Sequence, residues 1–180
     1  MSDMSTYTAK RFDPLQMTVE NVAIEDIAHA LSLTCRGGGQ IRYFFSVAQH
    51  SVNCAREAAA RGGTAREKLA CLLHDASEAY VSDIIRPVKP YLSNYYEIET
   101  RIMAVIREAF GLGTLTEVEE RFWKTIDDAM LSHELKTMLP GCEDFVLSPL
   151  AAVPDLSERP MREVEQEFLA LYELLKLTEA

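Results

Sequence analysis

Two histidines and two aspartates, widely separated in the chain, are the residues best suited to bind a metal ion. They are His50, the dipeptide His74-Asp75, and Asp127. Each falls within a stretch whose periodic apolar residues predict a helix, and an unpaired imidazole or carboxylate buried there is costly. A lone buried histidine or a lone HD dipeptide is more often an ordinary core feature. The four together indicate one divalent transition metal between three helices, and mixed nitrogen and oxygen donors suit manganese, cobalt, iron, nickel or zinc.

Glu78 is the candidate for the catalytic group at such a metal. It follows His74 by four residues and Asp75 by three, so on a continuous helix its carboxylate projects from the same face. A carboxylate there could orient or deprotonate a water molecule, and a bound divalent metal lowers the pKa of water to about 7 in favourable cases. The predicted chemistry is hydrolysis at a phosphate.

Basic residues near these positions could balance the charge of a phosphate. Arg36 and Arg42 precede His50, and Arg86 and Lys89 follow Asp83. Any one of them could equally be a solvated surface charge.

The hydrophobic pattern predicts an all-α bundle of about six helices with the metal site between its central helices. Capping boxes at Thr64/Glu67 and Thr116/Glu119 mark two helix starts, and glycine or proline follows most helix ends. No segment alternates as a strand would. The predicted helices cover residues 24–33, about 46–61, Thr64 through His74-Asp75, 93 to Gly111, 116–139, and a last one from Pro160 through Leu175.

Composition limits the other possibilities. A chain of 180 residues that is 48% hydrophobic suits a single domain over residues 1–180, with a core at about 22–140 and a C-terminal packing helix at about 158–177. The net charge of -10 opposes binding to a nucleic-acid polymer. No run of about 18 apolar residues occurs and the N-terminus is polar, so we expect no membrane association and a cytoplasmic location.

The cysteines show no spacing typical of a metal site or a disulfide framework. No C-x-x-C pair occurs, so we expect reduced, mostly buried thiols, none of them placed to complete a structural zinc site. The four are Cys35, Cys54, Cys71 and Cys142.

Three segments resemble the HD-domain phosphohydrolases over nearly the whole chain. They are IEDIAHALSLTCRGGGQIRYFFSVAQHS (24–51), LLHDASEAYVSDIIRPVK (72–89) and KTIDDAMLSHELKTML (124–139). The sequence is most similar to short phage and bacterial members close to the 5′-deoxynucleotidases and the HD-type deoxynucleoside triphosphate triphosphohydrolases.

The resemblance implies a role for each matching residue. The family's H…HD…D pattern implies metal binding by His50, His74, Asp75 and an aspartate of the fifth predicted helix. Asp127 fits K-x-x-D…L-x-x-E better, with Lys124, Leu131 and Glu134 around it, and Asp128 remains open. The stretch HDASEAYVSD implies a catalytic Glu78 and a substrate-binding Asp83, P-V-K implies the same for Lys89, and Arg36 stands near the family's phosphate-binding arginine.

The function predicted from these observations is a metal-dependent nucleotide phosphohydrolase, foremost a (deoxy)nucleoside 5′-monophosphate phosphatase. Release of triphosphate from a deoxynucleoside triphosphate is the alternative reaction. A non-catalytic nucleotide-binding regulatory module, or a helical scaffold without metal, is the alternative of another class. The resemblance also implies a homo-oligomer of two or more copies, with the segment from Tyr91 to Tyr96 as a candidate contact.

Overall fold

The helices predicted from the sequence are present, with one important difference after residue 72. The structure, a computed structural model, describes residues 3–177. Within that range there are seven α-helices and one pair of two-residue strands, which confirms the all-α fold class. The helices are α1 (Ile24–Leu33), α2 (Val47–Ala60), α3 (Ala65–Leu72), α4 (Glu78–Val81), α5 (Tyr95–Ala109), α6 (Glu117–Met138) and α7 (Met161–Leu177). The strands β1 (Met4–Ser5) and β2 (Arg11–Phe12) pair antiparallel, with Met4 opposite Phe12.

Side-chain caps account for three of the helix starts. Ser46 accepts a hydrogen bond from the Gln49 N–H at the start of α2. Both predicted capping boxes form, Thr64 with Glu67 before α3 and Thr116 with Glu119 before α6. Each box satisfies backbone N–H groups that have no partner within the helix.

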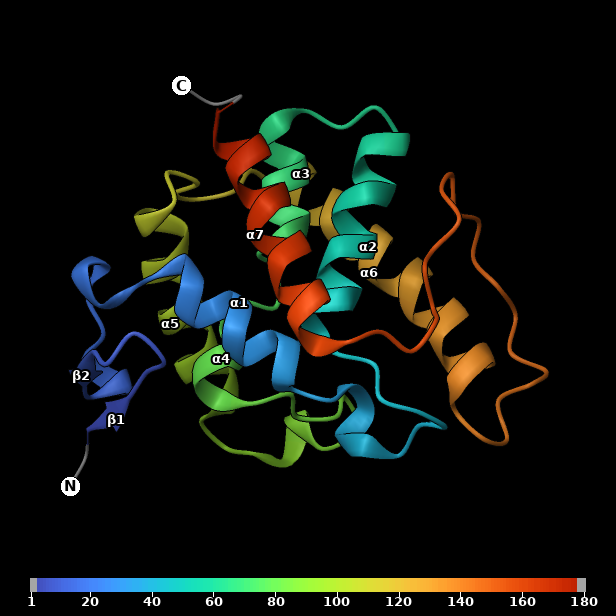
Figure 1. The fold of residues 1–180 in the computed structure, drawn as a ribbon, viewed down its shortest axis with the longest axis horizontal. Coiled ribbons are helices and arrows are strands. Elements are labelled where there is room, and N and C mark those ends of the chain that lie inside the picture. The colour runs from blue at the N-terminus through green and yellow to red at the C-terminus, as the bar shows by residue number, and fades with distance from the viewer. Residues whose placement is uncertain (1–2, 178–180) are drawn as a thin grey trace.

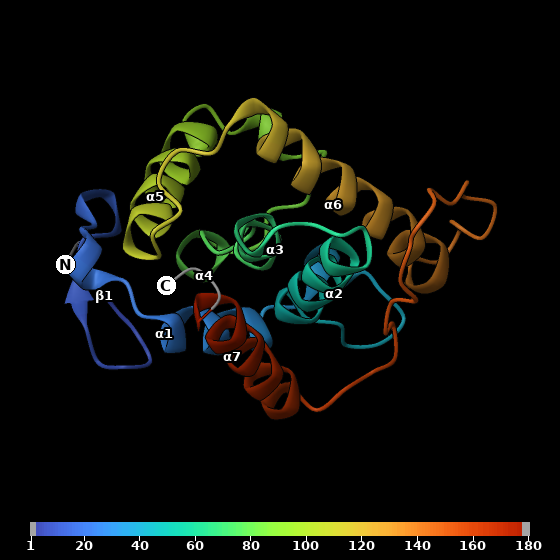
Figure 2. The same cartoon turned by 90° about the horizontal axis from the view of Figure 1, so that it is seen from above.

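Helix α2 lies at the centre of the bundle. It packs against α1, α3, α6 and α7 (Figure 1), and most of its residues are buried. Figure 2 shows α5 and α6 along one side of the molecule and α1 and α7 along the other, with α2 and α3 between them. A side chain of α2 or α3 can therefore reach α6, which is what a site shared by these elements requires.

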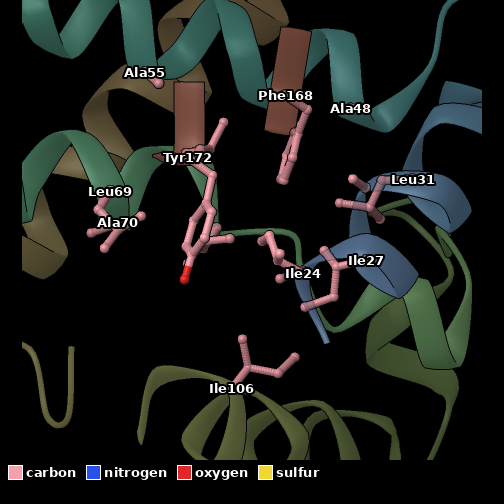
Figure 3. Close-up of a cluster of buried hydrophobic side chains, with 14 of the residues drawn as sticks. Ile24, Ile27, Leu31, Ala48, Ala55, Leu69, Ala70, Ile106, Phe168 and Tyr172 are labelled. Carbon is pink, nitrogen blue, oxygen red and sulfur yellow. The ribbon is translucent and has the colours of Figure 1, made fainter. Parts of the chain in front are cut away.

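The apolar core occupies the space between α1, α3, α5 and α7. Ile27 and Leu31 of α1, Ile106 of α5 and Phe168 of α7 are fully buried and point toward one another (Figure 3). Truncating a buried phenylalanine such as Phe168 to alanine typically costs about 3–5 kcal/mol. No helix in residues 3–177 combines the length and apolar character needed to cross a membrane.

Polar side chains of α2 attach the long segment between α6 and α7. Gln49, Asn53 and Glu57 recur every four residues on one face of α2. The Gln49 and Asn53 amides donate to the carbonyl of Asp155, and the Glu57 carboxylate accepts from the N–H groups of Ala151 and its neighbour Ala152. These bonds explain why polar residues are buried on this helix.

The prediction of one continuous helix through His74-Asp75 is wrong. Helix α3 ends at Leu72, a turn follows, and Glu78 begins the separate short helix α4. The His74 imidazole Nδ1 lies 2.7 Å from the carbonyl oxygen of Cys71, the acceptor that the Asp75 N–H would use in a continuing helix. The side chain therefore competes with the backbone for that carbonyl, and the chain turns.

Candidate metal centre

The structure brings His50, His74, Asp75 and Asp127 together from three elements. His50 comes from α2, His74 and Asp75 from the turn after α3, and Asp127 from α6. The Nε2 atoms of the two histidines are 3.2 Å apart. Asp127 Oδ1 lies 3.1 Å from His50 Nε2 and 3.7 Å from His74 Nε2. Asp75 Oδ2 lies 3.3 Å from His74 Nε2 and 3.8 Å from His50 Nε2.

The hydrogen bonds of the two rings set the tautomers that a metal requires. The Cys71 carbonyl can only accept, so His74 Nδ1 carries the proton and donates to it. His50 Nδ1 lies 2.6 Å from Oε1 of Glu134 and donates to that carboxylate. In its neutral form each ring therefore presents the lone pair of its Nε2 to the centre of the cluster.

These four donor atoms fit a divalent transition metal. The Nε2 atoms of two imidazoles converge with oxygens of two carboxylates, and a bound cation would replace the protons that these groups share in the metal-free protein. Nitrogen ligands about 2.1 Å from a tetrahedral zinc ion would be separated by about 3.4 Å, close to the 3.1–3.8 Å observed.

The electrostatic environment favours a cation in this cluster. Burial and Arg36 act to lower the pKa of His50, but Cys54, Glu134 and Asp127 outweigh them and raise that pKa well above its ordinary value. Burial acts to raise the pKa of Asp127, yet its hydrogen bonds with His50 and His74 lower it well below the usual range. Asp127 is thus an ionised carboxylate facing a position that stabilises positive charge.

The neighbouring aspartates of α6 are clearly distinguished. Asp127 Oδ1 faces the histidines, and its Oδ2 accepts from Arg86 at 3.1 Å. The Asp128 side chain is 63% exposed and accepts from the other Nη of Arg86 at 2.8 Å. Of the two, only Asp127 reaches the candidate ligands.

Arg36 connects the cluster to the glycine loop before α2. Its guanidinium donates to Asp75 Oδ2 at 3.1 Å and to Glu134 Oε2 at 3.2 Å. The next residue, Gly37, has φ of +62° and donates its N–H to Asp83 Oδ2 at 3.1 Å. A side chain at this φ would be strained, so glycine suits the turn that aims Arg36 inward. Arg36 and Asp83, both predicted to bind substrate, therefore form hydrogen bonds within the protein beside the candidate ligands.

A cavity of about 470 Å³ opens beside the cluster and contains every predicted substrate-binding residue. One part of its lining is apolar, and α6 contributes Leu131, Leu135 and Met138 to it. The charged lining residues are Arg36, Asp75, Glu78, Asp83, Arg86, Lys89, Asp127 and Glu134.

Glu78 and Lys89 form a buried pair in this cavity. Glu78 is 4% exposed, and burial together with Asp75 and Asp83 raises its pKa to about 9. Its Oε1 lies 3.5 Å from Lys89 Nζ, while its Oε2 has no hydrogen-bond partner among residues 3–177. Lys89 also donates to Glu99 at 3.1 Å. A buried carboxylate oxygen without a partner is unusual in a protein and indicates a position used by a ligand or a reacting group.

Two residues of the site were not assigned a role from the sequence. Cys54 Sγ lies 3.5 Å from His50 Nε2, and His50, Cys54 and His74 form a buried group whose ligand atoms all lie within 4.8 Å of one another. The expectation that no cysteine joins the metal site is therefore corrected. The available signal was the spacing of four residues between His50 and Cys54. Burial raises the pKa of Cys54 to about 11.

Glu134 is the second missed residue. It lies seven residues after Asp127, two turns along the same face of α6. Its carboxylate accepts a hydrogen bond from His50 Nδ1, the ring nitrogen opposite the proposed metal-binding Nε2. Burial acts to raise the pKa of Glu134, but His50 and Arg36 outweigh it and lower that pKa. Glu134 therefore acts on the metal site through His50.

The fold and this site define an all-helical protein with a candidate metal centre built from buried histidines, a cysteine and carboxylates. No known family model matches the sequence. The chain is 33% identical over 166 residues to "Uncharacterized protein YfdR" of Escherichia coli K12, covering 84% of this chain and 88% of that protein. It is 32% identical over 183 aligned positions to "Uncharacterized protein RCAP_rcc00048" of Rhodobacter capsulatus, covering 93% and 92%. The chain belongs to the family that includes these two proteins.

Proposed function

We propose that this protein is a metal-dependent phosphohydrolase of the HD superfamily, with (deoxy)nucleoside 5′-monophosphates as its substrates. The observation that carries the proposal is the unpartnered Oε2 of Glu78, in a cavity shared with the four candidate metal ligands. The order and spacing of those ligands resemble the H…HD…D pattern of the superfamily.

The metal would be held by His50, His74, Asp75 and Asp127. When bound, a divalent metal polarises phosphoryl oxygens and lowers the pKa of water. The charge of the cavity supports this requirement, because five carboxylates and three basic groups line it. Even with a proton on Glu78 the acidic groups outnumber the basic ones, so without a cation the lining would repel a phosphate.

Glu78 would handle the proton of the reaction. Its raised pKa leaves a proton on the carboxyl group near neutral pH, and Oε2 is the oxygen that is free of protein partners. Lys89 beside it supplies positive charge that favours the ionised form. A carboxyl group whose protonation state depends on such neighbours is suited to general acid–base catalysis.

The two parts of the cavity match the two parts of a nucleotide. Lys89 and Arg86 provide positive charge near the ligands, and Leu131, Leu135 and Met138 provide an apolar surface for the nucleoside. The cavity volume of about 470 Å³ falls within the usual range for small-molecule sites. Arg36 contributes by orienting Asp75 and Glu134 as well as by its charge.

The test is an assay of phosphate, pyrophosphate and triphosphate release from a panel of nucleoside mono- and triphosphates with added divalent metals. Wild type is compared with Asp75→Ala, Glu78→Gln and the control Glu57→Gln, which changes a buried carboxylate outside the cavity. We expect Glu78→Gln to lower kcat by about 10²–10⁴-fold with metal content unchanged. Asp75→Ala should lose metal and turnover together, and the control should retain both.

Each alternative reaction gives a different result in this assay. Release of triphosphate would identify a triphosphohydrolase. Metal and nucleotide binding without turnover would indicate a regulatory module and contradict the proposal, as would a protein that binds neither.

A further inference from the structure

We propose that Cys54 is a direct metal ligand on the core side of the cluster, and that it makes the site selective for thiophilic cations such as zinc and cobalt over manganese and magnesium. The inference rests on the metal site of the proposed function, but it adds a ligand outside the four-residue pattern. It also predicts the class of metal, which the sequence left open.

The separation of the donor atoms supports sulfur ligation. With Zn–S of about 2.3 Å and Zn–N of about 2.0–2.1 Å, tetrahedral geometry places sulfur and nitrogen about 3.6 Å apart and two nitrogens about 3.4 Å apart. The observed separations are 3.5 Å between Cys54 Sγ and His50 Nε2, and 3.2 Å between the two Nε2 atoms. The third pair, Cys54 Sγ and a ring nitrogen of His74, lies within 4.8 Å, so the three residues can bind one ion together.

The position of Cys54 on α2 makes this arrangement rigid. His50 and Cys54 are one helical turn apart in the middle of a continuous, buried helix, so their side chains lie one above the other. Cys54 packs on one side against Ala58, Ile126 and Met130, and its sulfur meets the imidazoles on the other. It thus borders both the apolar core and the candidate ligands.

Cys71 shows that burial alone does not bring a thiol to the metal site. It is as buried as Cys54 and belongs to the same apolar cluster, yet its sulfur is not among the atoms that could share an ion. It contributes only its backbone carbonyl, which accepts from His74. Cys71 is therefore a matched control for substitutions at Cys54.

The chemistry of the ligand predicts the metal preference. Formation of the metal–sulfur bond releases the thiol proton to solvent and leaves the thiolate as the ligand. Thiolates bind zinc, cobalt and iron(II) far better than manganese or magnesium, which prefer oxygen donors. A site with two imidazoles and a thiolate is therefore expected to discriminate against the harder cations.

The first experiment is the absorption spectrum of the protein loaded with cobalt(II), supported by X-ray absorption of the zinc form. We expect a sulfur-to-cobalt charge-transfer band in wild type, its retention in Cys71→Ser and its loss in Cys54→Ser. Zinc X-ray absorption of wild type should show one sulfur neighbour at about 2.3 Å. Cys54→Ser should also lose at least about 10-fold in its preference for zinc over manganese, the lower range seen when a residue supporting a metal is removed.

The outcomes separate this inference from the proposed function. Cobalt binding without the charge-transfer band, and a zinc spectrum with only nitrogen and oxygen neighbours, would overturn the role of Cys54 and leave the phosphohydrolase proposal intact. The sulfur band without hydrolysis of any nucleotide would support the ligand and refute the phosphohydrolase. A protein that binds no metal would refute both. The wild-type spectra decide the question even if Cys54→Ser does not fold.

Discussion

Glu134 provides the sharpest test of the candidate metal centre, because it is not itself one of the proposed ligands and acts on the metal through His50. Its Oε1 accepts from His50 Nδ1 at 2.6 Å, and its Oε2 accepts from Arg36 at 3.2 Å. Glutamine has nearly the same shape but only one acceptor oxygen. If the amide oxygen faces His50, the NH₂ group meets the Arg36 donor. If the amide is reversed, His50 loses its acceptor. One of the two hydrogen bonds is lost in either orientation.

The size of the effect follows from that loss. A hydrogen bond to a charged group is worth about 1.5–3 kcal/mol. Substitution of the residue that orients a metal-binding histidine typically weakens metal affinity about 10–100-fold, which corresponds to about 1.4–2.8 kcal/mol. The two ranges agree. We therefore expect Glu134→Gln to raise the dissociation constant for zinc by about 10–100-fold.

The assay is competition for zinc with a chromophoric chelator at fixed pH, with the folded state checked by circular dichroism. Glu57→Gln is the matched control, because it changes another fully buried carboxylate that has no contact with the cluster. We expect the control to bind zinc like wild type. A folded Glu134→Gln protein that binds zinc within about twofold of wild type would refute the role assigned to Glu134.

Three further predictions concern the ligand on α6, the metal and the loop after α6. In the same competition assay, Asp127→Asn should weaken zinc binding more than Glu134→Gln does, whereas Asp128→Asn should leave zinc binding unchanged. Equal effects of Asp127→Asn and Asp128→Asn would contradict the assignment of Asp127 as the ligand. Saturation with zinc at 100 times its dissociation constant should raise Tm by about 5–10 °C over chelator-treated protein in calorimetry, and no shift would argue against a site formed only in the folded state. Burial acts to raise the pKa of Glu57, but the N–H groups of Ala151 and Ala152 outweigh it and lower that pKa below 4.5. Its ionised form therefore stabilises the fold above about pH 4.5 and loses this contribution as pH falls through the folded-state pKa. In urea titrations, Glu57→Gln should lower the free energy of unfolding by about 2–3 kcal/mol at pH 7. The difference in unfolding free energy between wild type and variant should shrink as the pH falls below 4.5, and a difference that does not depend on pH would contradict this mechanism.

Most of the helices and the residue types of the site could be predicted from the sequence. Local signals were sufficient for this, because a capping box such as Thr116 with Glu119 and a periodic apolar stripe involve only residues within a few turns. The same signals placed His50 and Asp127 within buried helices, where an imidazole and a carboxylate require a partner. They failed at His74, whose side chain takes the carbonyl that would have continued α3. That competition depends on where packing directs the imidazole, and the hydrophobic pattern does not encode it.

Which of these residues meet depends on how the helices pack. Asp127 and Asp128 are equivalent in a sequence pattern, but the way α6 packs on α2 and α3 turns one toward the histidines and leaves the other in solvent. Helix packing also brings Cys54 and Glu134 to the site. Each lies at a helical spacing from a predicted ligand, but many ordinary core residues have the same spacing, so the spacing alone does not identify them. The rotation of each helix about its own axis comes from the summed packing of its whole buried face. Residues that are separated by 24 to 84 positions in the chain therefore converge only when the bundle is assembled.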